Sequence, residues 1–153
     1  MIVRIMIASM ALVALVMGQQ INAQMQDMVD NCRISVMRVS NDLVDTNMKL
    51  VQDLQKKAQN SLESSYQLDK LNKNINGIRE ELNALSANAG DMNPDRISRA
   101  VRNIATHQAE IFSMFMSPSF ALQMYDTWLW YVTESTRRNA ALMGQLPSSC
   151  TPN

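Results

Sequence analysis

Two observations predict an all-α protein, and a third bears on how its helices are arranged. The chain of 153 residues has only 4 Gly and 4 Pro, too few turn residues for a β-sandwich or a barrel. Apolar residues recur three and four positions apart over long stretches, as on one face of a helix. The two cysteines, Cys32 and Cys150, lie far apart in the chain. We therefore expect either an antiparallel hairpin of long helices or a four-helix bundle with heptad-like seams, closed by one disulfide.

Residues 1–23 have the anatomy of a secretory signal peptide. Arg4 supplies a positive charge, residues 5–17 are apolar or small, and a short polar segment ends at Ala23. The apolar segment is shorter than the roughly 20 residues that a membrane-spanning helix needs, although an uncleaved anchor is the alternative. We expect cleavage after Ala23, or as second choice after Gly18, and a secreted, extracellular mature protein without a membrane segment.

Residues 24–153 form one predicted helical domain. From Gln24 to Asn76 no Gly or Pro interrupts the chain, so helix is expected, and the helix should continue through Gly77. The apolar stripe weakens over residues 55–67. Residues 27–88 therefore form either one helix or two helices with a turn near residues 60–65. The two clear stripes consist of Val29, Cys32, Val36, Val39 and Leu43, and of Leu68, Leu71, Ile75, Ile78, Leu82 and Leu85.

A helix break is predicted at residues 89–94. Gly90 can end one helix in a left-handed conformation, Asn93 can cap the next helix, and Pro94 suits its first position. The helix that follows has Gln108 at one position of its apolar stripe. The other members of that stripe are Ile97, Val101, Ile104, Ile111 and Phe115.

A second break is predicted at residues 117–118, because Ser117 and Pro118 repeat the signal of a cap followed by proline. We expect the last helix to end near Gly144 and residues 145–153 to form a tail. Its apolar face is predicted to consist of Ala121, Met124, Tyr125, Trp128 and Val132.

The cysteines are expected to meet. In an oxidising compartment Cys32 and Cys150 can form one intramolecular disulfide. An even number of antiparallel helices returns the end of the chain to its beginning, which would place the two thiols side by side. Two free thiols, or a bridge to another chain, are the alternatives.

Several functions are not expected. With 14 basic and 14 acidic residues the chain has no net charge, which disfavours nucleic-acid binding. Residues 91–95 resemble half of a calcium loop, but Arg96 and Arg102 stand where that loop needs Gly and Glu. His107, the single histidine, lies at the edge of a stripe and is expected to be a half-covered interface residue. We predict no enzymatic activity, metal or cofactor.

The aromatic residues suggest two possible contact sites. Trp130 falls on the polar face of the last predicted helix, so it is expected to touch a partner protein, to touch a ligand, or to lie under another helix. The nine Met of residues 24–153 and the nearby aromatic residues serve either as core filler or as the lining of an apolar ligand pocket. The residues of that possible pocket are Met114, Phe115, Tyr125 and Trp128.

The layout resembles that of small secreted insect proteins of the TsetseEP-domain type. The resemblance consists of the signal peptide, the short helical mature chain, Cys32 and Cys150 near its ends, and heptad-like runs such as residues 68–78. It implies an extracellular, non-enzymatic protein. We therefore predict a secreted interaction or structural module that binds an unknown protein partner or associates with itself as a homodimer. The alternative is a carrier that binds a small apolar ligand between its helices.

Overall fold

The computed structural model describes the backbone of residues 2–57 and 62–148 and the side chains of residues 9–56 and 66–144. These residues form helices and no strand, which confirms the all-α prediction. The helices are α1 (Ile2–Lys57), α2 (Leu62–Ala87), α3 (Pro94–Phe115), α4 (Pro118–Gln123) and α5 (Tyr125–Ser148), with a 3₁₀ helix, η1 (Ala89–Asp91), between α2 and α3.

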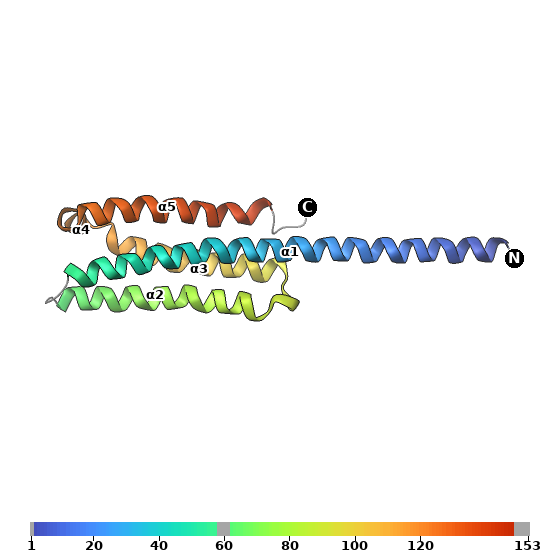
Figure 1. The fold of residues 1–153 in the computed structure, drawn as a ribbon, viewed down its shortest axis with the longest axis horizontal. Coiled ribbons are helices and arrows are strands. Elements are labelled where there is room, and N and C mark those ends of the chain that lie inside the picture. Colours follow the sequence, from blue (N-terminus) through green and yellow to red (C-terminus); the bar gives the residue numbers. More distant parts are fainter. Residues whose placement is uncertain (1, 58–61, 149–153) are drawn as a thin grey trace.

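The second half of α1 packs with α2, α3 and α5 as an antiparallel four-helix bundle (Figure 1). Helices α1 and α3 each contact both α2 and α5, so the four helices surround one core. Because α1 ends at Lys57 and α2 returns beside it from Leu62, residues 27–88 form two helices, and the long two-helix hairpin is excluded. The turn predicted near residues 60–65 falls partly on residues 58–61, outside the described residues. The four helices of one chain complete this core, so the core does not require a homodimer. A two-helix hairpin would have required a second copy to form a four-helix core.

The first half of α1 projects from the bundle as a single helix (Figure 1). Every described side chain from Ser9 to Met28 is exposed, and the buried core begins at Cys32. Removing residues 1–23 would therefore take no described side chain out of the core. The exposed large apolar residues of this segment before Ala23 are Met10, Leu12, Val13, Leu15, Val16, Met17 and Ile21.

The apolar stripes predicted for α2 and α3 face the core. All members of both stripes are buried except Leu68, which is half-buried, and Gln108 is buried with its stripe. In α1 the predicted stripe is buried from Cys32 onward and continues toward the C-terminus. The buried apolar residues at these seam positions of α1 are Cys32, Val36, Val39, Leu43, Leu50 and Leu54.

The caps predicted from proline positions are present, but Gly90 behaves differently. Asn93 Oδ1 accepts the backbone N–H of Arg96 at 2.9 Å, and Ser117 Oγ accepts that of Phe120 at 3.2 Å. Gly90 does not adopt a left-handed conformation, because α2 is followed by the 3₁₀ turn η1, which keeps ordinary negative φ angles.

The apolar face predicted for the last helix was correct only in part: Met124 is buried and Trp128 and Val132 are half-buried, but Tyr125 is exposed. The chain is also not one helix after Pro118. Met124 interrupts it between α4 and α5, with φ −137° and ψ 48°. After the interruption, the buried residues of α5 are Tyr131, Ser135 and Leu142. The end of the helix also differs from the prediction. Helix α5 continues to Ser148 through part of the predicted tail, and residues 149–153 lie outside the described residues.

Gly77 allows α3 to approach α2 closely. A Cβ atom at this position would overlap Cε1 and Nε2 of His107 and would lie 2.9 Å from its Cδ2. Alanine normally stabilises a helix by about 1 kcal/mol relative to glycine. At Gly77 the overlap should outweigh that gain. We expect Gly77→Ala to lower the free energy of unfolding by roughly 1–3 kcal/mol, measured by urea unfolding with circular dichroism.

The matched control is Gly144→Ala. Gly144 also lies in a helix, but a Cβ there would meet nothing within 4 Å. This substitution should raise the free energy of unfolding by about 0.5–1 kcal/mol. Equal effects of the two substitutions would show that the His107 ring does not occupy the space above Gly77.

Candidate functional site

A ring of three hydrogen bonds lies inside the bundle. Asn47 Nδ2 donates to Gln108 Oε1 at 2.8 Å, and Gln108 Nε2 donates to the Tyr131 hydroxyl at 3.0 Å. The Tyr131 hydroxyl donates in turn to Asn47 Oδ1 at 2.9 Å. The three buried side chains come from α1, α3 and α5, and we call them the polar triad.

The polar triad fixes how three helices align along the bundle. Sliding one helix by a turn would leave buried amide or hydroxyl groups unpaired. Each unpaired group would destabilise the folded protein by about 1–3 kcal/mol. Burial raises the pKa of Tyr131 well above its ordinary value of 10.0, although hydrogen bonds with Gln108 and Ser135 lower it in part. The hydroxyl is thus neutral at neutral pH. Two amides and a neutral phenol offer no general base, so we assign the triad a structural role.

His107 forms a second polar contact, between α3 and α2. Its Nδ1 is hydrogen-bonded to Asn74 Oδ1 at 2.9 Å, and Asn74 Nδ2 donates to the Lys70 carbonyl at 3.1 Å. His107 is half-buried, as expected for an interface histidine. Among residues with described side chains, no group of three or more His, Cys, Asp and Glu residues is placed to hold a metal ion.

Trp130 is half-buried against α1. Lys49 Nζ lies 3.9 Å from the centroid of its ring, a cation–π contact, and the indole packs on the apolar core. Of the three expectations for Trp130, this geometry matches coverage by another helix. A cavity of about 210 Å³ beside the ring is lined by Asp42, Asp45, Thr46, Lys49, Trp130 and Arg138.

The four residues of the predicted ligand pocket are not equivalent in the structure. Phe115 is fully buried and packs edge-on against Phe120, with ring centroids 4.8 Å apart, and against Tyr131 at 6.1 Å. Tyr125 is exposed and stacks on the half-buried Trp128, at 6.2 Å and 28°. Met114 is half-buried. Phe115 is thus a core residue, and Tyr125 belongs to the surface.

Cys32 is fully buried on the side of α1 that packs into the bundle, and Cys150 lies outside the described residues. The disulfide therefore stays a prediction. The alignment of α1 and α5 bears on this disulfide, because the Tyr131 hydroxyl donates to Asn47 and Arg138 Nη1 lies 3.4 Å from Asp42 Oδ2. Continuing this antiparallel register along the two helices brings Ser148, the last residue of α5, opposite Cys32.

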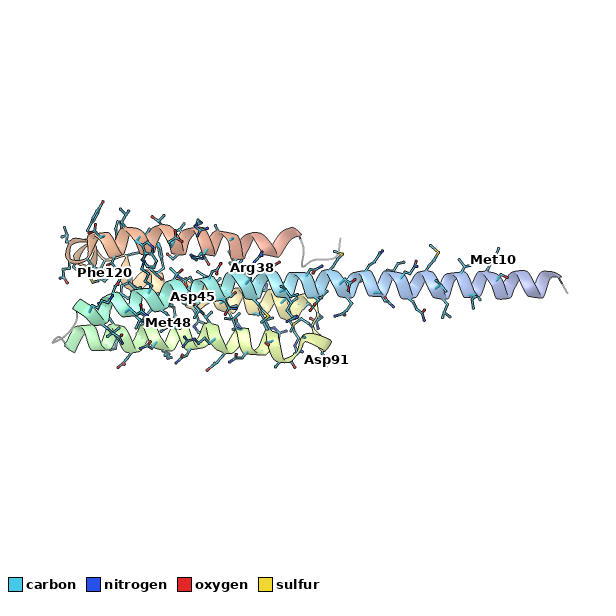
Figure 2. All side chains as sticks on the ribbon, in the orientation of Figure 1. Met10, Arg38, Asp45, Met48, Asp91 and Phe120 are labelled. Carbon is cyan, nitrogen blue, oxygen red and sulfur yellow. The ribbon has the colours of Figure 1, made fainter. Side chains whose placement is uncertain are left out.

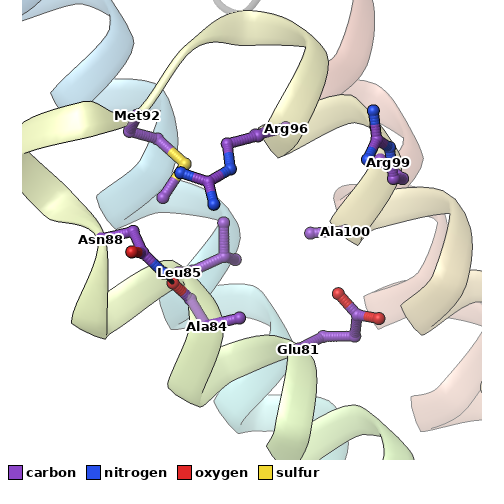
Figure 3. Close-up of a pocket in the computed structure, with 8 residues that line it drawn as sticks. All are labelled: Glu81, Ala84, Leu85, Asn88, Met92, Arg96, Arg99 and Ala100. Atoms are coloured by element: carbon purple, nitrogen blue, oxygen red, sulfur yellow. Dashed lines mark hydrogen bonds between the residues drawn. The ribbon is translucent and has the colours of Figure 1, made fainter.

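The segment that resembles a calcium loop, residues 91–95, runs from the last residue of η1 into the first turn of α3. A cavity of about 120 Å³ lies there, and in Figure 3 Arg96 reaches toward Asn88 and Met92 while Glu81 lies at the other end. Glu81 Oε1 accepts a hydrogen bond from Asn103 Nδ2 at 2.7 Å. The cavity is well below the roughly 300 Å³ at which ligand pockets begin, so it suits a few water molecules.

Large apolar side chains are exposed around α4, at the end of the bundle opposite the projecting part of α1 (Figure 2). Leu122 in α4 is 86% exposed and Tyr125 is 59% exposed. Met116, the residue after α3, and Leu129, one turn after Tyr125, are each nearly half exposed. We call these four residues the α4 surface.

The α4 surface lies in a stretch with very few charges. Asp126 is the single charged residue between Glu110 and Glu134. The cores of protein–protein interfaces are likewise depleted of charge and enriched in Tyr, Trp, Phe and Met. Reasoning from helical stripes missed this surface, because it treated Tyr125 as part of the core face. The absence of charge was the available signal in the sequence.

Within the described residues, no helix is long and apolar enough to cross a membrane. Comparisons of this chain with protein-family models, with curated proteins and with solved structures find no match.

Proposed function

We propose that the protein is an exported, non-enzymatic helical bundle that binds a partner protein outside the cell through the α4 surface. Export is supported by the composition of residues 1–23 and by the exposed apolar side chains of the projecting helix, which contribute nothing to the core. Cleavage after Ala23 would leave the bundle packing intact. The layout resemblance to secreted insect proteins points to the same compartment and stays a prediction.

The α4 surface is the observation that carries the proposed interaction. A side chain such as Leu122, which is 86% exposed, gains little from folding the chain alone. Three more large apolar side chains, each at least 45% exposed, fall within the same 14 consecutive residues at this end of the bundle, where a partner could cover them. Tyr125 adds a rigid aromatic ring of the kind that often contributes strongly to binding. The low charge of the region favours contact with an apolar surface over contact with a charged one.

A disulfide between Cys32 and Cys150 belongs to this proposal. The antiparallel register of α1 and α5 supports it, since Cys150 comes two residues after Ser148, where α5 ends opposite Cys32. The bond would tie the end of the chain to the start of the bundle, at the end opposite the α4 surface. It would stabilise the bundle without covering the proposed binding surface.

We expect Leu122→Asp to abolish partner binding while leaving the fold unchanged. A carboxylate in the centre of an apolar interface would have to lose its hydration, which should weaken binding at least about tenfold. The measurement is affinity capture from extracellular fluid of the source organism on immobilised wild-type and variant protein. Proteins retained by the wild type should be lost with the variant.

The matched control is Gln123→Asp. Gln123 is the next residue of α4, is also exposed, and is not part of the α4 surface. Both variants should unfold at the wild-type urea concentration. If the Leu122→Asp protein retains the same partners as the wild type, the α4 surface does not bind them.

A further inference from the structure

A cavity of about 460 Å³ lies between α3 and α5, away from the α4 surface. Its volume falls within the roughly 300–1,000 Å³ of small-molecule sites. Two turns of each helix line it. The lining residues are Gln108, Ala109, Phe112, Ser113, Ser135, Thr136, Asn139 and Ala140.

The cavity exists because small side chains face one another across the two helices. Ser135 is buried, whereas Ala109 and Ser113 on α3 and Ala140 on α5 are exposed, so the cavity opens to solvent between the two helices. No lining residue carries a charge, and the half-buried Phe112 contributes an aromatic ring. An occupant of this site must therefore be mostly apolar and uncharged.

One buried polar atom of the lining has no hydrogen-bond partner. Asn139 Oδ1 is buried and unpaired, whereas both polar atoms of Gln108 are used in the polar triad. Buried carbonyl oxygens usually accept a hydrogen bond, so this one lacks a donor. Because the terminal torsion of an Asn side chain is soft, the amide can turn toward the cavity without moving the backbone.

We propose that the cavity between α3 and α5 binds a small, neutral, mostly apolar molecule whose single O–H or N–H donates to Asn139 Oδ1. The short length of the cavity favours a small molecule over a partner helix, since its lining covers six residues of each helix, about 8 Å. The site is independent of the α4 surface, so either can fail without the other. It also differs from the ligand pocket predicted from Met114, Phe115, Tyr125 and Trp128.

The test uses N-phenyl-1-naphthylamine, a neutral apolar fluorophore with one N–H, titrated into protein from which residues 1–23 have been removed. We expect saturable binding to the wild type. Ala140→Trp should fill the cavity and weaken binding roughly tenfold or more. The matched control, Ala141→Trp, changes the neighbouring exposed alanine outside the cavity and should bind like the wild type.

A second pair of measurements tests the hydrogen bond to Asn139. 1-Benzylnaphthalene replaces the N–H of the probe by a methylene group, and its affinity is measured by displacing the probe. The wild type should prefer the N–H compound about fivefold, and Asn139→Leu should remove that preference. The proposal is overturned if the wild type shows no saturable binding, if Ala140→Trp binds as tightly as the wild type, or if Ala141→Trp weakens binding equally. An unchanged preference in Asn139→Leu would equally overturn the assigned contact.

Discussion

Cys150→Ser is expected to lower the free energy of unfolding of the oxidised protein by about 4 kcal/mol. The reason is that a bond from Cys150 to Cys32 closes a loop of most of the mature chain, which restricts the unfolded state strongly. Cys150 is the better position to change, because Cys32 is fully buried and its replacement would also disturb the core. Urea unfolding of the two proteins, followed by circular dichroism, measures the difference.

The control for this prediction is a reductant. Reduction should destabilise the wild type to the level of Cys150→Ser and should have no effect on the variant. A wild-type protein whose unfolding midpoint is the same with and without reductant would contradict the bridge. That result would not contradict the four-helix bundle, because the bundle core consists of apolar seams that do not depend on the disulfide.

Asn47→Leu is expected to destabilise the bundle by about 3 kcal/mol, although it adds an apolar side chain to the core. The substitution leaves Gln108 Oε1 without a donor and the Tyr131 hydroxyl without an acceptor, and both are buried. The triple variant Asn47→Leu, Gln108→Leu, Tyr131→Phe should recover most of the lost stability, because it leaves no unpaired polar group in the core. Asn41→Leu, an exposed position on the same helix, should change stability by less than about 0.5 kcal/mol.

The same triad predicts how stability depends on pH. Burial raises the pKa of Tyr131 in the folded protein above its ordinary value of 10.0. A group with a raised folded pKa contributes its full stabilisation below the unfolded pKa and loses it as the pH rises beyond that value. The free energy of unfolding, measured below and above pH 10, should fall at alkaline pH. The fall should be smaller in Tyr131→Phe than in the wild type. An identical loss in the two proteins would show that the Tyr131 hydroxyl ionises freely in the folded state.

Much of the fold could be predicted from local patterns. The stripes of α2 and α3 follow helical spacing, and Asn93 and Ser117 each precede a proline at a helix start, so their caps depend on neighbouring residues alone. The break at Met124 could not be predicted this way, because neither Gly nor Pro marks it. Tyr125 begins α5 directly after this break and is exposed, although it was predicted on the core face.

Contacts between distant residues were harder to predict. Gln108 was recognised at a seam position. Its pairing with Asn47 and Tyr131, however, depends on how three helices are positioned relative to one another along the bundle axis. The small residues that open the cavity between α3 and α5 likewise gain their meaning only when the two helices face each other. The α4 surface could have been found from the scarcity of charge in residues 111–133.

Mass spectrometry of the protein recovered from the medium of secreting cells tests the central claim, an exported bundle whose two ends are joined. The predicted result is a chain that begins at Gln24 and a peptide pair, containing Cys32 and Cys150, that separates only on reduction. A chain found only inside the cell that keeps residues 1–23, with both cysteines alkylated without reductant, would contradict it.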